Sequence, residues 1–442
     1  MIILPGLQER MKRWPVWLLS LYAACCSFGV YFCMYAFRKP FTVAGYEGIY
    51  FAGASYKVWL VIAQVMGYML SKFYGIRFIS GMQPEKRASI IVKLILFSWL
   101  ALLLFAIVPP PYSIVFLLLN GFPLGMIWGL VFSYVEGRKT TEFMGAVLAI
   151  SFIFSSGVVK SVGKLVILEG HYSEWWMPFI TGGLFVLPML LFTCLLNHLP
   201  PPTTEDIQLR SVRKPMTTAE RRDFIMQYLP GIILIVATYV LLTILRDFRD
   251  NFANELWKEQ GYGNQAGIFT ETEIPVSLAV LFCMSLLILV KNNIRAFMIN
   301  HYMVIAGYAL ALISTILFMY HEAGPFWWMV MVGTGLYLSY VPFNALYFER
   351  MIASYRIKGN VGFIMYIADS FGYLGSILVL LCKEFTGLKV SWTGFFINAI
   401  LAVSIAGIMG TLLAAVYFKR KYEHGRAANT TDNTLWNVKE QL

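Results

Sequence analysis

The feature that most constrains this chain is a row of apolar stretches, each about 20 residues long, which recurs along the whole sequence. A helix of that length crosses the hydrocarbon core of a bilayer, and it satisfies its own backbone hydrogen bonds there. The sequence therefore predicts an all-α polytopic membrane protein. Reading it in windows of that length gives twelve expected transmembrane helices, at residues 15–37, 51–71, 88–108, 112–135, 142–168, 176–197, 228–249, 272–290, 296–319, 325–348, 360–382 and 392–418.

Composition and charge placement agree with this interpretation. Only 13% of the 442 residues are charged, against about 25% in a soluble domain. The net charge of +11 comes from Lys and Arg residues that a twelve-span topology places on one side of the membrane. They lie in segments that include Arg10 to Arg13, Lys72 to Arg87, Arg138 and Lys139, Arg210 to Arg222, Lys291 and Arg295, Arg350 to Lys358, and Lys419 to Arg426. The positive-inside rule then predicts a multi-pass protein of the inner (plasma) membrane with both termini cytoplasmic, and no nucleic-acid partner.

A polar, proline-rich stretch divides the chain into two sets of six spans. We expect a first half at residues 1–197, a cytoplasmic linker at 198–227, a second half at 228–420 and a polar tail at 421–442, without fixed structure. The sequence "FRKPF" at the end of the first span is repeated as "FRDNF" at the end of the seventh, 211 residues later. Six spans, a linker and six related spans are the layout of the major facilitator fold.

Several classes of chemistry find no support in the sequence. The six cysteines lie in or beside apolar spans, and the five histidines show no metal-ligand spacing. No span carries a nucleophile triad, a phosphate loop or a zinc motif. We therefore expect neither an enzyme nor a bound cofactor or metal.

Charges near the ends of the first and seventh spans are the candidates for function. A charge at the centre of a span costs about 2.5–3.5 kcal/mol on insertion scales, so it needs a partner or a role. Arg38 and Lys39 end the first span, and "RDFRD" from Arg246 to Asp250 ends the seventh. Two guanidiniums that converge in a central cavity would bind a phosphate or phosphonate bidentately. The alternative is that these side chains snorkel to water, with Asp247 and Asp250 neutralising their own arginines.

At these residues the sequence resembles the organophosphate:phosphate antiporters, especially the glycerol-3-phosphate transporters. The resemblance is carried by "VYFCMYAFRKPF", "GFPLGMIW", Leu245-Arg246, "TETEIP", "GTGLY" and "FGYLGS", in the family's order along most of the chain. It implies that two arginines hold a phosphate group while tyrosines and a tryptophan line the site. Carried over by position, the substrate-binding residues are Arg38, Arg246, Tyr31, Tyr35, Trp128, Tyr337 and Tyr373, with Arg249 in reserve because the internal repeat favours it.

The sequence also departs from that family. The family's binding histidine aligns with Phe154, its second-helix lysine lies near Ala63, and its glutamine becomes Leu124. Lys160 and Asp369 are charges that the family lacks. We therefore expect a substrate other than glycerol 3-phosphate.

The remaining charges suggest a gate and a coupling group. Lys39, Lys160, Asp250, Glu271 and Glu273 are expected to form salt bridges that close the outer seam between the halves. Asp369 lies one helical turn before Tyr373, so it would share the cavity face. It either carries a coupling proton or forms a structural pair with a lysine of a neighbouring helix.

Together these features predict a secondary transporter, a monomer in the lipid bilayer, that moves a small organic anion by alternating access. Phosphate or a proton would be the coupling ion, through exchange or symport. The alternative is a receptor that senses a phosphorylated metabolite without transporting it.

Overall fold

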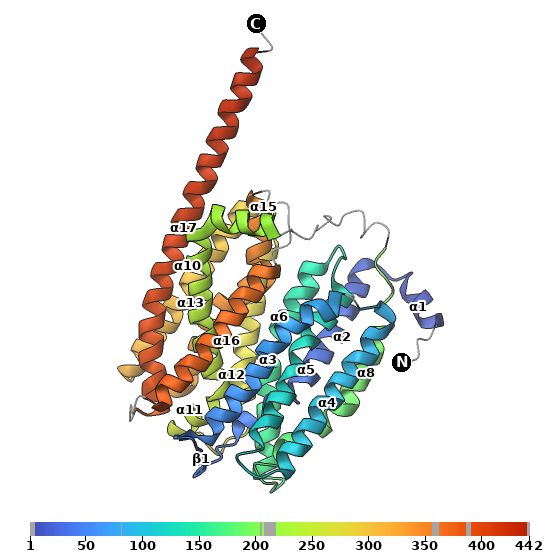
Figure 1. Cartoon of the computed structure of the whole chain (residues 1–442), viewed down its shortest axis with the longest axis vertical. Helices are drawn as coiled ribbons and strands as arrows, with labels where there is room; N and C mark the ends of the chain where they lie inside the picture. The colour runs from blue at the N-terminus through green and yellow to red at the C-terminus, as the bar shows by residue number, and fades with distance from the viewer. Residues whose placement is uncertain are drawn as a thin grey trace.

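The computed structural model describes residues 5–80, 82–203, 206, 218–355, 362–385 and 390–439, and the chain is helical over most of them (Figure 1). Residues 204, 205 and 207–217 of the expected linker, including Arg210, Arg213 and Lys214, lie outside the described residues, as do Arg356, Lys358 and Lys389.

The first half contains six helical spans. A short helix, α1 (Pro5–Met11), precedes α2 (Val16–Tyr35), which is followed by the 3-10 turn η1 (Pro40–Val43). The small hairpin β1 (Tyr50–Phe51) and β2 (Ala54–Ser55) pairs antiparallel, with Ala52 and Gly53 at positive φ in its turn. The rest of the half consists of α3 (Tyr56–Ser80), η2 (Pro84–Lys86), α4 (Arg87–Ile107), α5 (Ile114–Val135), α6 (Thr141–Leu168), α7 (Met177–Leu184) and α8 (Val186–Asn197).

The second half repeats the six-span arrangement. It consists of α10 (Thr218–Asn251), α11 (Ala253–Glu259), α12 (Ile268–Ile288), α13 (Asn293–Met319), α14 (Pro325–Pro342), the π-helical segment η3 (Phe343–Tyr347), α15 (Phe348–Tyr355), α16 (Gly362–Phe385) and α17 (Trp392–Lys439). Thus α10 begins inside the stretch expected to be linker, and α17 continues through the tail that was expected to lack structure. A formed helix extends readily into polar sequence because each added residue gains a backbone hydrogen bond.

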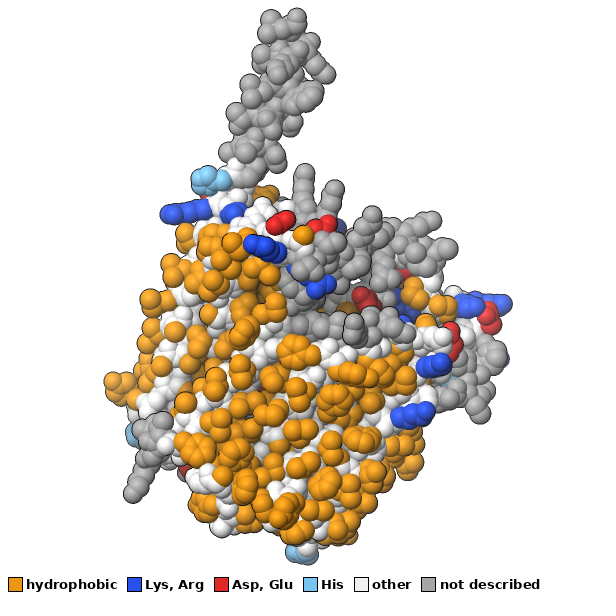
Figure 2. All heavy atoms as spheres, viewed as in Figure 1, with side chains coloured by type: hydrophobic (Ala, Val, Ile, Leu, Met, Phe, Trp, Pro, Cys, Tyr) orange, Lys and Arg blue, Asp and Glu red, His pale blue; other side chains and the backbone are white. Residues whose placement is uncertain are grey.

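Within the described residues, eight helices are individually long and apolar enough to cross a membrane, and α7 with α8 makes one further span bent by 41°. The helices α3, α14 and α16 complete the expected set of twelve. The chain is therefore an all-α, multi-pass membrane protein. In the view of Figure 2 hydrophobic side chains cover the flanks of the helices, while Lys, Arg, Asp and Glu gather near the end that carries the C-terminal helix.

Two ends of the molecule can be distinguished. We call the end with the β1–β2 hairpin and α11 the hairpin end, and the opposite end, with α1 and α15, the linker end (Figure 1). The two halves meet along α6 and α12 and along α3 and α16. Glycine brings one of these pairs close: a Cβ added at Gly157 of α6 would lie 2.6 Å from the Phe269 carbonyl oxygen of α12.

Candidate functional site

Arg38 and Lys39 lie in a turn between α2 and η1 where the regular helix has ended. Proline at position 40 has no N–H and a fixed φ, so it begins a new turn and does not continue α2. The turn is held from two other helices: the Gln64 Nε2 donates to the Arg38 carbonyl oxygen at 2.8 Å, and the Asn120 Nδ2 donates to the Phe37 carbonyl oxygen at 3.0 Å. Two basic side chains are thereby fixed inside the protein, with exposed fractions of 7% and 3%.

The guanidinium of Arg38 has no carboxylate partner among the residues that the structure describes. Its Cζ lies 3.9 Å from the ring centroid of Tyr68 and 5.7 Å from that of Tyr35, which places it on aromatic faces. Its Nε is buried without a hydrogen-bond acceptor, and Arg38 forms no ion pair with any residue that the structure describes. A buried cation without a counter-charge is costly. An anion bound here would supply the counter-charge that this guanidinium lacks among the described residues.

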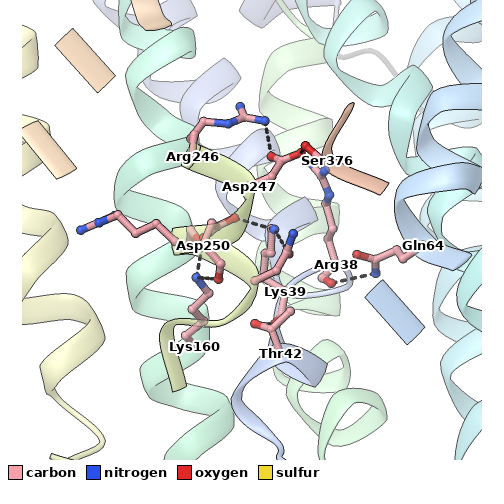
Figure 3. A network of polar contacts seen from close by, with 12 residues as sticks. Arg38, Lys39, Thr42, Gln64, Lys160, Arg246, Asp247, Asp250 and Ser376 are labelled. Atoms are coloured by element: carbon pink, nitrogen blue, oxygen red, sulfur yellow. Dashed lines mark hydrogen bonds and ion pairs between the residues drawn. The ribbon is translucent and has the colours of Figure 1, made fainter. Parts of the chain in front are cut away.

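Arg246 of α10 is held differently. Its guanidinium lies over Tyr340 at 4.1 Å from the ring centroid, and its Nη2 contacts the Asp247 Oδ1 at 2.5 Å. The other oxygen of Asp247 accepts from the Ser376 hydroxyl at 3.1 Å (Figure 3). The expectation that Asp247 neutralises its own arginine thus agrees with the geometry. An incoming anion would share Arg246 with Asp247.

Tyrosines connect the two arginines. The rings of Tyr68 and Tyr373 meet edge-to-face at 5.5 Å, and both Tyr35 and Tyr373 lie close enough to Arg38 and Arg246 to interact electrostatically with each. Tyr31 packs against Tyr35 at 5.5 Å. We call Tyr31, Tyr35, Tyr68, Tyr340 and Tyr373 the tyrosine cluster. Its rings lie against both guanidiniums, which come from opposite halves of the protein.

Asp250 is held by side chains of the first half, and Figure 3 shows Lys39 and Lys160 directed toward it. The Lys39 Nζ lies 2.5 Å from its Oδ2, while Lys160 and the Ser156 hydroxyl bind its Oδ1. Lys39 also donates to the Asn251 Oδ1 at 2.7 Å. Asp250 therefore does not neutralise Arg249, its expected partner, but joins the two halves.

The internal repeat has a structural meaning at this seam. Positions 39 and 250 differ by the repeat offset of 211 residues, and their side chains pair with each other. The same offset relates Glu47 to Lys258, which also form an ion pair across the halves, on the exposed surface. That neighbouring carboxylate raises the pKa of Lys258. Repeat-equivalent residues of opposite charge thus meet across the seam.

Further contacts close the hairpin end. Lys57 is buried, donates to the Thr42 carbonyl oxygen at 2.6 Å and forms an ion pair with Glu255 of α11. Burial raises the pKa of Glu255, although Lys57 acts to lower it. Lys164 donates to the Asn254 Oδ1 at 3.2 Å. At the linker end, the described residues Arg350 and Glu142 form an ion pair of 3.3 Å between the halves.

Two of the residues expected at the outer seam are placed differently. Glu273 pairs with Arg249 of its own half, with 2.6 Å between Oε1 and Nη1, and not with a lysine of the first half. Gly157 lets α6 and α12 pack closely, so Glu273 of α12 lies against α6. In that position its carboxylate is within reach of Arg249 of α10. Glu271, two residues earlier, is exposed and forms no ion pair with any described residue.

The remaining expected residues lie as follows. Asp369 accepts from the Tyr239 hydroxyl, and its Oδ2 lies 3.5 Å from the Lys72 Nζ of α3, so it has the lysine partner that the structural alternative requires. Tyr337 packs on Phe152 at 5.8 Å and lies 5.9 Å from the Arg249 guanidinium. Trp128 is half-buried and stacks on Phe132 at 4.9 Å, one turn along α5.

Sequence reasoning did not single out Tyr68, Tyr340 or Tyr239. Each is one aromatic residue in an apolar span, where an aromatic residue is ordinary. The one available signal for Tyr68 was Lys72, a charge one helical turn later, which lies 5.1 Å from its ring centroid.

The fold that holds this site is the major facilitator fold. Three similar solved structures are a D-xylose–proton symporter (TM-score 0.57, 14% identity, covering 90% of this chain and 97% of that chain), the nucleoside transporter NupG (0.57, 14%, 91% and 99%) and the xylose transporter XylE from E. coli in an inward-open conformation (0.55, 12%, 90% and 95%). At these identities the likeness shows the fold alone. It does not show the narrower resemblance to the organophosphate antiporters.

Residues 40–421 match the family model described as a family of unknown function, DUF5690, and the protein belongs to that family. A search of the curated proteins found no significant match.

Proposed function

We propose that this protein is a secondary transporter that moves a small organic anion, a phosphate ester or phosphonate, across the inner (plasma) membrane by alternating access. Solved structures of the same fold are named as sugar and nucleoside transporters, which supports transport. The resemblance of the first, fourth and seventh spans to the organophosphate:phosphate antiporters supports the anion class.

The observation that carries the proposal is the unpaired guanidinium of Arg38. It is 7% exposed, stacked on Tyr68, and its Nε has no acceptor. A tetrahedral anion would supply the missing charge and would accept two parallel hydrogen bonds from the planar guanidinium. Arg246 would contact the same anion from the second half, and Tyr31, Tyr35, Tyr337 and Tyr373 would line the site around it.

Alternating access follows from where the polar contacts lie. The pairs of Lys39 and Lys160 with Asp250 and of Lys57 with Glu255 hold the halves together at the hairpin end. We assign that end to the exterior and the linker end, with both termini, to the cytoplasm, as the positive-inside rule predicts. An anion bound between Arg38 and Arg246 would draw the halves together at the centre, and these outer contacts would break when the site opens outward.

The first test is ligand binding to the purified protein. Inorganic phosphate, alkyl phosphonates, phosphate esters and matched carboxylates should be compared by the rise in thermal unfolding temperature that a bound ligand causes. Stabilisation by the tetrahedral anions, and its loss in Arg38→Lys, is the expected result. Stabilisation by neutral sugars but by no anion would contradict the proposal.

The second test separates a transporter from a sensor. Protein in liposomes preloaded with an anion that stabilises it should accumulate the same labelled anion by counterflow. A sensor would bind the anion with equal affinity and show no counterflow.

A further inference from the structure

The ion pair of Arg249 with Glu273 has no place in the anion site described above. It is built where α6, α10, α12 and α14 meet: a Cβ added at Gly333 of α14 would lie 2.5 Å from the Arg249 Nη2, and one at Gly157 of α6 would lie 2.8 Å from the Glu273 Cβ. Arg249 also donates to the Met329 carbonyl oxygen at 3.1 Å. The ion pair therefore fits between α6 and α14 because both helices have glycine at the point of contact.

The pair is incompletely satisfied. The Glu273 Oε2 and the Arg249 Nε are both buried without hydrogen-bond partners. Both residues line one small pocket, together with Lys160 and Thr272. A carboxylate oxygen that faces a pocket and lacks a donor is a place where a proton can bind, because protonation removes the charge that has no partner.

The other buried acids of the described chain are engaged differently. Asp247, Asp250 and Asp369 each use both carboxylate oxygens: with Arg246 and Ser376, with Lys160 and Lys39, and with Tyr239 and Lys72. Glu255 also has an unpartnered oxygen, but its partner is Lys57 at the hairpin end. Among these five acids, only Glu273 combines an arginine partner with a carboxylate oxygen that has no hydrogen-bond partner. That arginine, Arg249, lies three residues after Arg246 and 5.9 Å from the ring centroid of Tyr337.

We propose that Glu273 is the proton-binding group that couples transport, so that one proton and one anionic charge enter together. This inference rests on the proposed function and deepens it by naming the driving ion. The proton binds at Oε2, and Arg249 then loses its counter-ion. The uncompensated guanidinium, beside Tyr337, raises the positive potential at the anion site. Anion binding in turn favours protonation, because coupling between two sites is reciprocal.

The charged and titratable groups around Glu273 set the direction of this coupling. Arg249 and Asp250 face it from α10, Lys160 from α6 and Tyr337 from α14. Asp250 also acts on Arg249, but both of its carboxylate oxygens are bound by lysines, so it compensates Arg249 only in part when Glu273 is protonated. The remaining positive charge is left for the substrate.

Sulfate is the appropriate probe, because this tetrahedral anion stays fully ionised between about pH 5 and pH 8, the range in which a coupled group would titrate. Its dissociation constant for the purified protein should be measured across that range. We expect the affinity to fall about tenfold per pH unit above the midpoint, which is the slope for one linked proton. In Glu273→Gln the affinity should be independent of pH and equal to the low-pH value of the unmodified protein.

Proteoliposomes give the second readout. Glu273→Gln should retain exchange of labelled sulfate for sulfate but should lose accumulation driven by an inside-alkaline pH gradient. Glu47→Gln is the control, since it neutralises an exposed carboxylate outside the anion site, and it should keep both the slope and the accumulation. Asp369→Asn tests the other buried carboxylate that the sequence suggested for coupling. If Glu273→Gln does not fold, Glu273→Asp replaces it and should keep the slope with a displaced midpoint.

The outcomes separate the two proposals. Failure of the unmodified protein to bind any tetrahedral anion would overturn the proposed function and this inference with it. Sulfate binding whose pH slope survives in Glu273→Gln, or whose midpoint does not move in Glu273→Asp, would overturn this inference and leave the anion transporter standing. Loss of the slope in Asp369→Asn alone would assign the coupling to Asp369.

Discussion

The two halves of this protein each present an arginine to the tyrosine cluster, but they balance its charge differently. Arg38 of the first half lies on Tyr68 with no carboxylate partner in the described part of the chain, whereas Arg246 of the second half is paired with Asp247. The repeat equates Arg38 with Arg249, and that arginine is paired too, with Glu273. Two arginines at equivalent positions of the repeat therefore differ in whether they have an ion-pair partner. Under the proposed function, the first half would supply the main anion ligand, and the ion pairs of the second half would set how strongly its arginines contribute.

A similar contrast exists along the seam. Lys39 with Asp250 and Glu47 with Lys258 occupy positions with the same repeat offset, but the first pair is buried and the second is 60–72% exposed. Exposed ion pairs contribute little, while removing one partner of a buried pair leaves an uncompensated charge. The buried pair should therefore dominate closure of the hairpin end.

The largest effect should come from replacing Arg38, the arginine without a carboxylate partner among the described residues. Arg38→Lys keeps the positive charge but loses the planar fork, so we expect anion binding to weaken by about 2–5 kcal/mol, the range for truncating a buried charged contact. Arg246→Lys should cost less, because Asp247 already shares that guanidinium. Titration calorimetry with inorganic phosphate measures both. Equal losses in the two variants would show that the pairing with Asp247 is irrelevant to binding.

The next largest effect should come from breaking the buried ion pair between Lys39 and Asp250. Asp250→Asn removes the carboxylate that Lys39 and Lys160 share, so we expect the hairpin end to open more often. A cysteine introduced within the tyrosine cluster should then react several-fold faster with a membrane-impermeant thiol reagent added from outside. Glu47→Gln is the control at the exposed pair and should leave the labelling rate nearly unchanged. A similar rate in both variants would mean that burial does not decide the strength of this closure.

A smaller effect of opposite sign is expected at Asp247. Asp247→Asn should release Arg246 from its neighbour and make the second half resemble the first, so anion affinity should rise by about tenfold, or about 1.4 kcal/mol. Thermal stabilisation by phosphate at several concentrations measures the change. Weaker binding in this variant would show instead that Asp247 positions Arg246 for the substrate.

The smallest effect is expected at Trp128. Its ring stacks on Phe132, so Trp128→Phe should change anion affinity by less than about 1 kcal/mol, within the range of a substitution that removes no charge or hydrogen bond. Anion affinity should be measured for Trp128→Phe and Arg38→Lys in the same assay, with the loss in Arg38→Lys as the reference. A loss of anion affinity as large as that in Arg38→Lys would show that Trp128 contacts the substrate, as the family resemblance implies.

The sequence by itself determined the spans, the all-α membrane fold and the elements that bring charge to the centre. Span length and apolarity are properties of consecutive residues, and the cost of burying a charge in a bilayer marks residues such as Arg38, Lys39 and Asp250 wherever they occur. The repeat of "FRKPF" as "FRDNF" also placed Lys39 and Asp250 at equivalent positions, which proved to be partners across the seam.

Only the tertiary structure decided which side chains meet. A helix that is apolar on all sides carries little information about its rotation, so the sequences of α3 and α14 did not predict that the rings of Tyr68 and Tyr340 would lie against the two guanidiniums. The pairing of Glu273 with Arg249 depends on how closely α6, α12 and α14 approach at Gly157 and Gly333. Asp369 found Lys72 because α16 packs on α3 of the other half. These partners lie far apart in the chain, and only the packing of the two halves sets the distances between them.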